Sequence, residues 1–175
     1  MLLSIEDRNA GDAIVRAAQQ GDRVAFGALY EQYSRMVHGI LLAHAPYGDV
    51  DDLMQDVFVR ALRQLPALRE PAAFGAWLCA IARRAATDHA RARRRLLFRM
   101  PERSGGPRPD GEAFAILESI RQLPESYRET LLLRLVEGMT GSEIAARTGL
   151  TAESVRVNLC RGMKMLRELL EGNKK

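Results

Sequence analysis

The amino-acid sequence predicts an all-α protein made of two small helical domains joined by a flexible linker. Apolar residues recur at intervals of three and four, as on one face of a helix, and no segment alternates with the period of two that is typical of a strand. A stretch rich in proline and glycine separates two groups of such segments. The second group ends in the pattern of a helix-turn-helix, so the C-terminal domain is expected to contain this motif.

The linker is predicted at residues 99–112, which read RMPERSGGPRPDGE. Six of the eleven residues from Pro101 to Gly111 are proline or glycine, and none is aliphatic. Such a stretch cannot bury enough apolar surface to be ordered alone. The chain therefore divides into an N-terminal domain at 12–98 and a C-terminal domain at 113–171.

Three amphipathic helices are expected in the N-terminal domain. The first follows Asp22, a suitable N-cap, and its predicted buried face is Phe26, Leu29, Tyr30, Tyr33 and Val37. The second ends at Pro66, and its buried face is Val50, Leu53, Met54, Val57 and Ala61. Pro71 suits the first turn of the third, whose buried face is Phe74, Leu78, Ile81 and Ala85.

Four short helices are expected in the C-terminal domain. The first buries Phe114, Leu117 and Ile120. The second starts at Pro124, stops at Gly138 and buries Tyr127, Leu131 and Leu135. Thr140 and Glu143 then have the spacing of a capping box, Gly149 supplies a left-handed turn residue, and Thr151 caps the last helix. This order of helix, glycine turn and longer helix predicts the helix-turn-helix.

The last helix has one apolar stripe and one cationic face. The stripe, Val155, Leu159, Gly162 and Leu166, is expected to face the core. The opposite face carries Glu153, Arg156, Val157, Cys160, Arg161 and Lys164. Arginine and lysine suit contacts to phosphate or guanine, and small apolar side chains suit a thymine methyl group. DNA binding is the favoured interpretation, and a solvated face or a protein-binding face is the alternative.

Two further segments of the N-terminal domain are strongly charged. Residues 49–56, DVDDLMQD, contain four acidic residues and no basic one. These acids either stabilise the N-terminus of a helix or bind a basic partner protein. From Arg83 to Arg99 there are seven arginines and one acid, Asp88. Like charges on one helix face repel one another, and a nucleic acid would relieve this repulsion with release of counterions. Nucleic-acid binding is the favoured interpretation, and a solvated basic face is the alternative.

No metal, cofactor or disulfide is expected. Cys79 and Cys160 form no paired motif, and His38, His44 and His89 lack metal-ligand spacing. No apolar run is long enough for a membrane span, and the first residues lack the pattern of a secretory signal, so a cytoplasmic protein without membrane insertion is expected.

From Asp12 to Leu170 the sequence resembles the extracytoplasmic-function (ECF) sigma factors of the sigma-70 family. Residues 49–62, DVDDLMQDVFVRAL, look like region 2.2, and residues 73–95, AFGAWLCAIARRAATDHARARRR, look like regions 2.3 and 2.4. Residues 123–169, from LPESYRETLLLRL to KMLREL, look like region 4. The three stretches occur in the family's order around a linker, so the resemblance implies a factor that binds core RNA polymerase and directs initiation at promoters.

The resemblance also implies roles for individual residues. Positions that dock on the β′ coiled coil of the polymerase correspond to Asp51, Asp52, Gln55, Asp56 and Phe58. Positions at the −10 element correspond to Arg69, in the 65–73 loop that captures a flipped base, and to Arg83, Arg84, Asp88, Arg91 and Arg94. Positions at the −35 element correspond to Arg156, Val157, Cys160, Arg161 and Lys164. The β flap of the polymerase, promoter DNA and an anti-sigma factor are the other implied partners.

The sequence departs from the family where Arg84 replaces a usual asparagine and where Val157 and Cys160 replace polar or aromatic residues. Two other classes of protein remain as alternatives. A helix-turn-helix regulator that acts without polymerase would explain the C-terminal domain but neither charged segment. An enzyme would use Asp51, Asp52 and Asp56 to bind Mg²⁺, but no second acidic cluster accompanies them.

Overall fold

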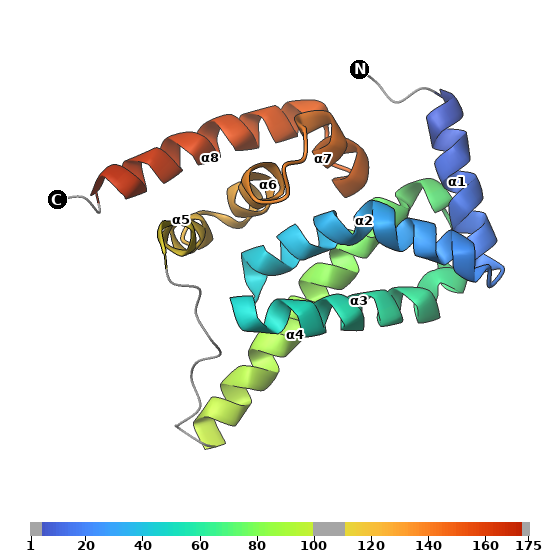
Figure 1. Cartoon of the computed structure of the whole chain (residues 1–175), viewed down its shortest axis with the longest axis horizontal. Helices are drawn as coiled ribbons and strands as arrows, with labels where there is room; N and C mark the ends of the chain where they lie inside the picture. Colours follow the sequence, from blue (N-terminus) through green and yellow to red (C-terminus); the bar gives the residue numbers. More distant parts are fainter. Residues whose placement is uncertain (1–4, 100–110, 173–175) are drawn as a thin grey trace.

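The computed structural model describes residues 5–99 and 111–172, which form eight α-helices, short 3-10 turns and no strand (Figure 1). The helices are α1 (Ile5–Gln19), α2 (Arg23–His44), α3 (Val50–Gln64), α4 (Phe74–Arg99), α5 (Glu112–Arg121), α6 (Glu125–Leu135), α7 (Gly141–Thr148) and α8 (Ala152–Gly172). The 3-10 turns are η1 (Tyr47–Asp49), η2 (Leu65–Ala67) and η3 (Pro71–Ala73). The predicted all-α class is confirmed, and most of the predicted linker (100–110) lies outside the described residues.

The predicted helix boundaries follow from local hydrogen bonds. The carboxylate of Asp22 accepts from the backbone N–H groups of Val24 and Ala25 at 2.8 and 3.1 Å, so Asp22 caps α2. Thr140 and Glu143 form the expected capping box of α7. Gly149 has a φ of 77°, in the left-handed region, and ends α7. The helix-turn-helix predicted at α7 and α8 is therefore present.

Helix α1 was not among the predicted helices. Its packed residues include Ile14, Val15 and Ala18, so the apolar face is narrow and partly made of alanine. Its last turn is attached to the loop before α4, because the Gln19 side-chain amide donates to the carbonyls of Leu65 at 3.1 Å and Leu68 at 2.7 Å.

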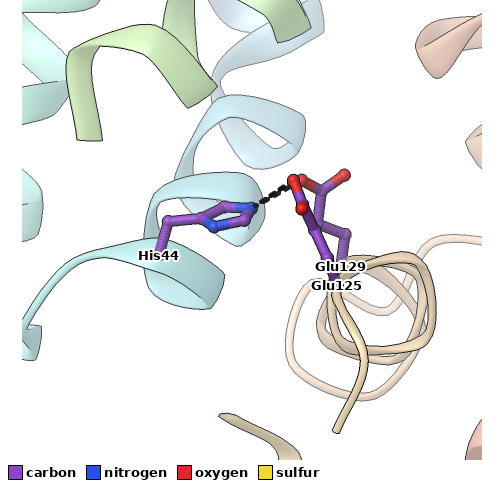
Figure 2. Close-up of side chains that lie close together, drawn as sticks. All are labelled: His44, Glu125 and Glu129. Atoms are coloured by element: carbon purple, nitrogen blue, oxygen red, sulfur yellow. Dashed lines mark hydrogen bonds and ion pairs between the residues drawn. The ribbon is translucent and has the colours of Figure 1, made fainter. Parts of the chain in front are cut away.

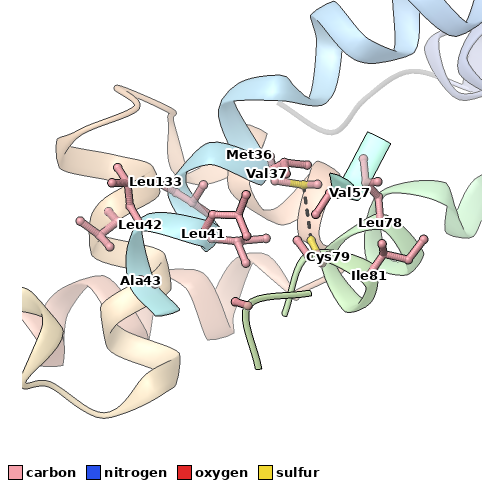
Figure 3. Close-up of a cluster of buried hydrophobic side chains, with 14 of the residues drawn as sticks. Met36, Val37, Leu41, Leu42, Ala43, Val57, Leu78, Cys79, Ile81 and Leu133 are labelled. Atoms are coloured by element: carbon pink, nitrogen blue, oxygen red, sulfur yellow. Dashed lines mark hydrogen bonds between the residues drawn. The ribbon is translucent and has the colours of Figure 1, made fainter. Parts of the chain in front are cut away.

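The core of the N-terminal domain is close to the prediction. Helices α1, α3 and α4 pack against α2, and most residues of the three predicted faces are buried. Tyr30 is an exception, because its side chain is 45% exposed and its ring lies over Phe58 at a centroid distance of 4.5 Å. Burial raises the pKa of the Cys79 thiol to about 12, and this thiol donates to the Met36 sulfur at 3.4 Å (Figure 3).

Helices α2 and α6 are buried on more than one side. Near its end α2 buries a continuous run at residues 39–43, and α6 buries Leu131, Leu132 and Leu133 in succession. Helix α6 packs against α8 within its own domain and also against α2 (Figure 1), where the Leu133 side chain lies against Gly39. The two domains therefore share a packed interface.

The predicted burial of Leu135 is wrong, since this side chain is 46% exposed. The prediction assumed that α6 has one buried face, which would place Leu131 and Leu135 on the same stripe. The interface with α2 instead buries Leu133, on a different side of the helix, and the helix ends at Leu135.

Two glycines allow the domains to approach closely. A Cβ atom on Gly75, in the first turn of α4, would overlap the backbone carbonyl of Arg147 in α7. A Cβ atom on Gly39 would lie 2.8 Å from the side chain of Leu133. Close backbone approach of this kind requires the absence of a side chain.

Across the described ranges, no helix has the length and apolar character that would let it cross a lipid bilayer.

We expect Thr140→Ala to lower the free energy of unfolding by about 1 kcal/mol, because the Glu143 backbone N–H loses its side-chain acceptor. Urea denaturation followed by circular dichroism would measure this change. The matched control is Thr87→Ala, whose hydroxyl is exposed and donates within its own helix to the Arg83 carbonyl. Equal losses in the two variants would contradict a role for the cap.

Candidate polymerase and nucleic-acid interfaces

The first two turns of α3 present an acidic surface. Asp51, Asp52, Gln55 and Asp56 are all exposed. Phe58, the fifth predicted docking residue, is only 5% exposed, and it packs beneath the rings of Phe26 and Tyr30. Phe58 thus supports this surface from the core. Val59 and Leu62, which were not predicted, are 45% and 49% exposed on the same helix.

Asp49, at the start of this segment, has a different role. Its side chain makes no capping hydrogen bond to α3. It instead contacts His89 at 2.9 Å and Arg93 at 3.1 Å, both in α4. The acid that was expected to stabilise a helix N-terminus therefore links η1 to the arginine-rich helix.

The arginines of α4 fall into two groups. Arg84, Arg91 and Arg94 are exposed, as is Arg69 in the loop before α4. Asp88 is also exposed and lies 3.7 Å from Arg60, a separation typical of a weak surface pair. Arg83 differs, because its guanidinium is paired with an acid of the C-terminal domain.

One face of α8 is buried and the opposite face is exposed, as predicted. Val155, Gly162 and Leu166 are buried and Leu159 is half-buried. On the other side Arg156, Cys160, Arg161 and Lys164 are exposed, and Val157 is half-buried. A long helix that follows a glycine turn and exposes three cations has the form of a recognition helix.

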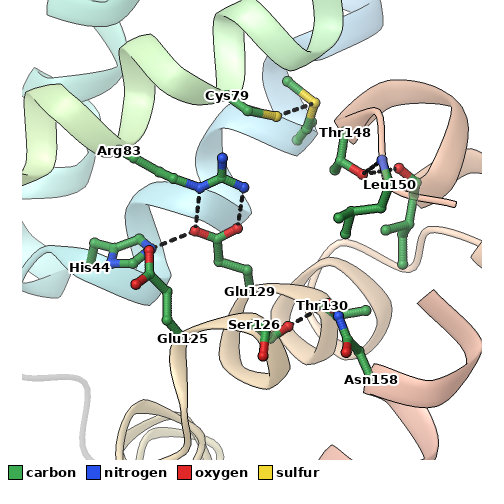
Figure 4. A network of polar contacts seen from close by, with 12 residues as sticks. His44, Cys79, Arg83, Glu125, Ser126, Glu129, Thr130, Thr148, Leu150 and Asn158 are labelled. Carbon is green, nitrogen blue, oxygen red and sulfur yellow. Dashed lines mark hydrogen bonds and ion pairs between the residues drawn. The ribbon is translucent and has the colours of Figure 1, made fainter. Parts of the chain in front are cut away.

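Glu129 of α6 is the centre of a polar cluster between the domains (Figure 4). Arg83 donates to both of its carboxylate oxygens, from Nε at 2.8 Å and from Nη2 at 2.6 Å. His44 Nε2 lies 2.6 Å from the same carboxylate. Burial would raise the pKa of Glu129, but the hydrogen bonds from Arg83 and His44 outweigh it and hold the pKa below its usual value.

Other bonds join the C-terminal domain to the end of α2. Arg121 donates to the carbonyls of Leu42 at 2.9 Å and Ala45 at 2.5 Å, and Arg128 donates to the carbonyl of Ala43 at 2.9 Å. The last carbonyls of a helix have no partner within it, so these arginines supply the missing donors. This contact could not be predicted from the sequence, because the residues at a helix C-terminus do not indicate which distant side chain will donate to them.

His44, Glu125 and Glu129 place their ligand atoms within 4.8 Å of one another (Figure 2). Such a trio could in principle hold a metal ion. The two hydrogen bonds from Arg83 already place a full positive charge against Glu129, and a divalent cation there would be repelled. We therefore interpret the trio as part of an ion-pair cluster.

Comparison with known proteins identifies the family. The model of Sigma-70 region 2 matches residues 29–96, and the model of Sigma-70 region 4 matches residues 113–166. The ECF RNA polymerase sigma-E factor of Escherichia coli (strain K12) is 30% identical, over 87% of this chain and 90% of that protein. RNA polymerase sigma factor NccH of Alcaligenes xylosoxydans xylosoxydans is also 30% identical, over 95% of this chain and 98% of that protein.

The solved structure of CnrH in complex with the cytosolic domain of CnrY matches with a TM-score of 0.63 and 27% sequence identity, over 93% of this chain and 98% of the matched chain. These matches define a bacterial-type transcription-initiation factor. The chain belongs to the ECF sigma factors of the sigma-70 family, and it directs transcription initiation by RNA polymerase. The two alternative classes, a polymerase-independent regulator and a magnesium enzyme, are thereby set aside.

The contact between His38 and Glu137 should make stability depend on pH. The hydrogen bond from His38 Nδ1 to Glu137, at 2.6 Å, raises the pKa of His38 although burial opposes it, and the charge of Asp51 adds to the rise. A raised pKa means that folding favours the protonated form, so the stabilisation is complete below about pH 6.5 and is lost as the pH rises through the raised value.

We therefore expect the thermal midpoint of the wild type to fall more between about pH 6 and pH 9 than that of His38→Gln. Differential scanning calorimetry in matched buffers would measure both curves. The other histidines are common to the two proteins, so their titration cancels in the comparison. Parallel curves would show that this contact does not contribute.

Proposed function

We propose that the two domains of this sigma factor divide the work of initiation. Residues 12–98 bind core RNA polymerase and the −10 element, residues 113–171 recognise the −35 element, and residues 99–112 connect them. The observation that carries the proposal is the separation of charge on exposed surfaces: acids gather on α3, and cations gather on α4 and α8. Opposite charges suit opposite partners, a basic protein surface for the first and DNA for the other two.

The acidic surface of α3 is the proposed site for the β′ coiled coil of the polymerase. Asp51, Asp52, Gln55 and Asp56 would contact it directly, and Phe58 would hold the helix in place from the core. Electrostatic complementarity of this kind raises the rate and specificity of association. In the C-terminal domain, Leu135 and Val136 are 46% and 51% exposed and offer an apolar contact for the β flap.

The arginine face of α4 is the proposed site for the −10 element. Arg84, Arg91 and Arg94 are exposed and free to contact phosphates, and Asp88 lies among them. Arg69 is exposed in the loop proposed to hold a flipped base. Arg83 belongs to the same face, but it can reach DNA only after it leaves Glu129.

The exposed face of α8 is the proposed site for the −35 element. Residues near the start of a recognition helix contact base edges in the major groove. Arg156 and Arg161 suit guanine or phosphate, Lys164 suits phosphate, and Val157 and Cys160 suit a thymine methyl group. Sequence specificity would then rest chiefly on the first half of this helix.

We also propose that an anti-sigma factor regulates this protein. Support comes from CnrH, which is 27% identical and whose structure includes the cytosolic domain of a second protein, CnrY. A factor of this kind acts on core polymerase and promoter DNA, so we propose that it works in the cytoplasm.

We expect Asp52→Arg and Asp56→Arg each to abolish co-elution with purified core polymerase, because a charge reversal would face a basic docking surface. Size-exclusion chromatography of the mixture would measure binding. The matched control is Glu171→Arg, which makes the same change at an exposed position near the end of α8. Wild-type binding by both α3 variants would contradict the docking site.

We expect Arg156→Ala and Arg161→Ala each to weaken promoter binding by about 1–3 kcal/mol, the usual contribution of a bidentate base contact. Run-off transcription from genomic fragments with core polymerase would first identify a promoter. Titration of DNA that contains its −35 element with each variant would then measure the binding free energy. Arg167→Ala is the control, since Arg167 is exposed about three turns after Arg156 on the same helix. Normal transcription by the first two variants would show that another face binds the −35 element.

A further inference from the structure

We propose that Gln19, at the end of α1, is a positioning residue that orders the 65–73 loop for the base it captures. The Gln19 side-chain amide donates to the backbone carbonyls of Leu65 at 3.1 Å and Leu68 at 2.7 Å. One side chain thus holds the carbonyls that lie on either side of the 3-10 turn η2. The inference rests on the proposed role of this loop in the capture of a flipped −10 base.

The backbone of the loop depends on these two bonds. The Leu65 carbonyl that accepts from Gln19 also accepts from the Leu68 N–H at 3.0 Å, so the Gln19 contact supports the turn itself. Leu68 is already extended, with a ψ of 115°, and Gln19 is the donor to its carbonyl. Pro66 and Pro71 have no N–H group with which to hold the loop.

The loop is anchored on one side and exposed on the other. Leu65 is fully buried, and Leu68 packs against the core. Ala67, Arg69 and Glu70 are exposed. Apolar contacts have no direction, so the two leucines do not fix how the peptide groups between them are turned. Hydrogen bonds are directional, and the pair from Gln19 fixes this orientation.

Gln19 is itself held by the structure around it. Val15 and Ala18, in the last turns of α1, are only 2% and 4% exposed. Gly21, with a φ of 92°, turns the chain into α2 two residues later. Helix α1 packs against both η2 and η3, so it lies behind the loop at one end of the N-terminal domain (Figure 1). This gives α1, the helix that the sequence did not predict, a part in promoter recognition.

An ordered loop binds a flipped base more tightly than a flexible one. Extrusion of a base from the stack costs free energy, and each backbone residue that must be ordered at the same time adds to that cost. With Gln19 in place the loop is ordered when the protein folds, whereas without it the DNA would have to order the loop. Loss of Gln19 should therefore weaken binding of the −10 strand, and the weakening should depend on the captured base.

Two substitutions remove the Gln19 contact by different means. Gln19→Ala deletes the amide. Gln19→Glu keeps the size of the side chain but replaces the N–H donors by a carboxylate that would face two carbonyl oxygens. The matched control is Gln20→Glu, which makes the same change at the next residue, whose side chain is exposed.

Hydrogen–deuterium exchange of the free full-length protein would show whether Gln19 orders the loop. We expect peptides that cover residues 65–73 to exchange faster in both Gln19 variants and at the wild-type rate in the control. The rest of the N-terminal domain should keep its protection. Unchanged exchange in the loop of both variants would overturn the proposal. A rise across the whole domain would also overturn it, because Gln19 would then stabilise the fold in general.

Binding of single-stranded −10 DNA by the holoenzyme would test the effect on base capture. The probe is a labelled non-template strand from a promoter identified by run-off transcription, and fluorescence anisotropy measures its affinity. A series of strands with one abasic site each locates the captured base, whose removal should weaken wild-type binding most.

On the intact strand we expect Gln19→Ala to weaken binding about fivefold, the usual effect of one lost hydrogen bond, and Gln19→Glu to weaken it further. The Gln20→Glu control should bind as the wild type does. On the strand without the captured base, all four proteins should bind alike, because the loop then has no base to hold.

The abasic series separates failure of the inference from failure of the proposed function. If no abasic site weakens wild-type binding more than the others, the protein captures no base, and the inference falls with the role proposed for the loop. If one site does, but the Gln19 variants bind the intact strand normally, the loop captures a base without Gln19 and only the inference is wrong. Equal losses on the intact and abasic strands would overturn the inference in the same way.

Discussion

The burial of the second half of α2 between two sets of helices is the constraint on which the rest of the structure depends. One side of this helix packs on α3 and α4, and another packs on α6. A helix with one solvated face can bury its apolar face within a single domain. In α2, however, residues 39–43 are all buried, so every side of the helix is covered there. Hydrophobic burial of this kind holds the two domains against each other, and it also brings the polar groups at their boundary into contact.

Those polar groups give the interface its specificity. Glu129 is a mostly buried carboxylate, and such a charge is tolerated only with good partners, here Arg83 and His44. Because both partners come from the other domain, separation of the domains leaves all three groups to find water or new ligands. The interface is therefore held in part by charges, each of which depends on its partner in the other domain.

Much of the fold could be predicted from local patterns. The caps at Asp22 and Thr140, the turn at Gly149 and the stripe that includes Val155 and Leu166 depend on residues a few positions apart, and all are as expected. The predictions for Tyr30 and Leu135 were wrong and α1 was missed, because burial at these places is set by elements distant in the sequence. The same limit applies to the site: the exposed cations of α8 followed from helical periodicity, whereas the pairing of Arg83 did not.

By itself the sequence determined the helices of the two domains other than α1, the helix-turn-helix and the family, because periodicity, capping and charged segments are local properties of the chain. Only the tertiary structure decided that the domains pack together, that Phe58 lies in the core, that Asp49 binds α4 and that Glu129 holds Arg83. Arg83 and Glu129 are 46 residues apart, and the apolar or charged character of a residue does not specify a partner at that distance. The partner is set by the relative positions of two packed domains, which depend on the shapes of all the contacting side chains together.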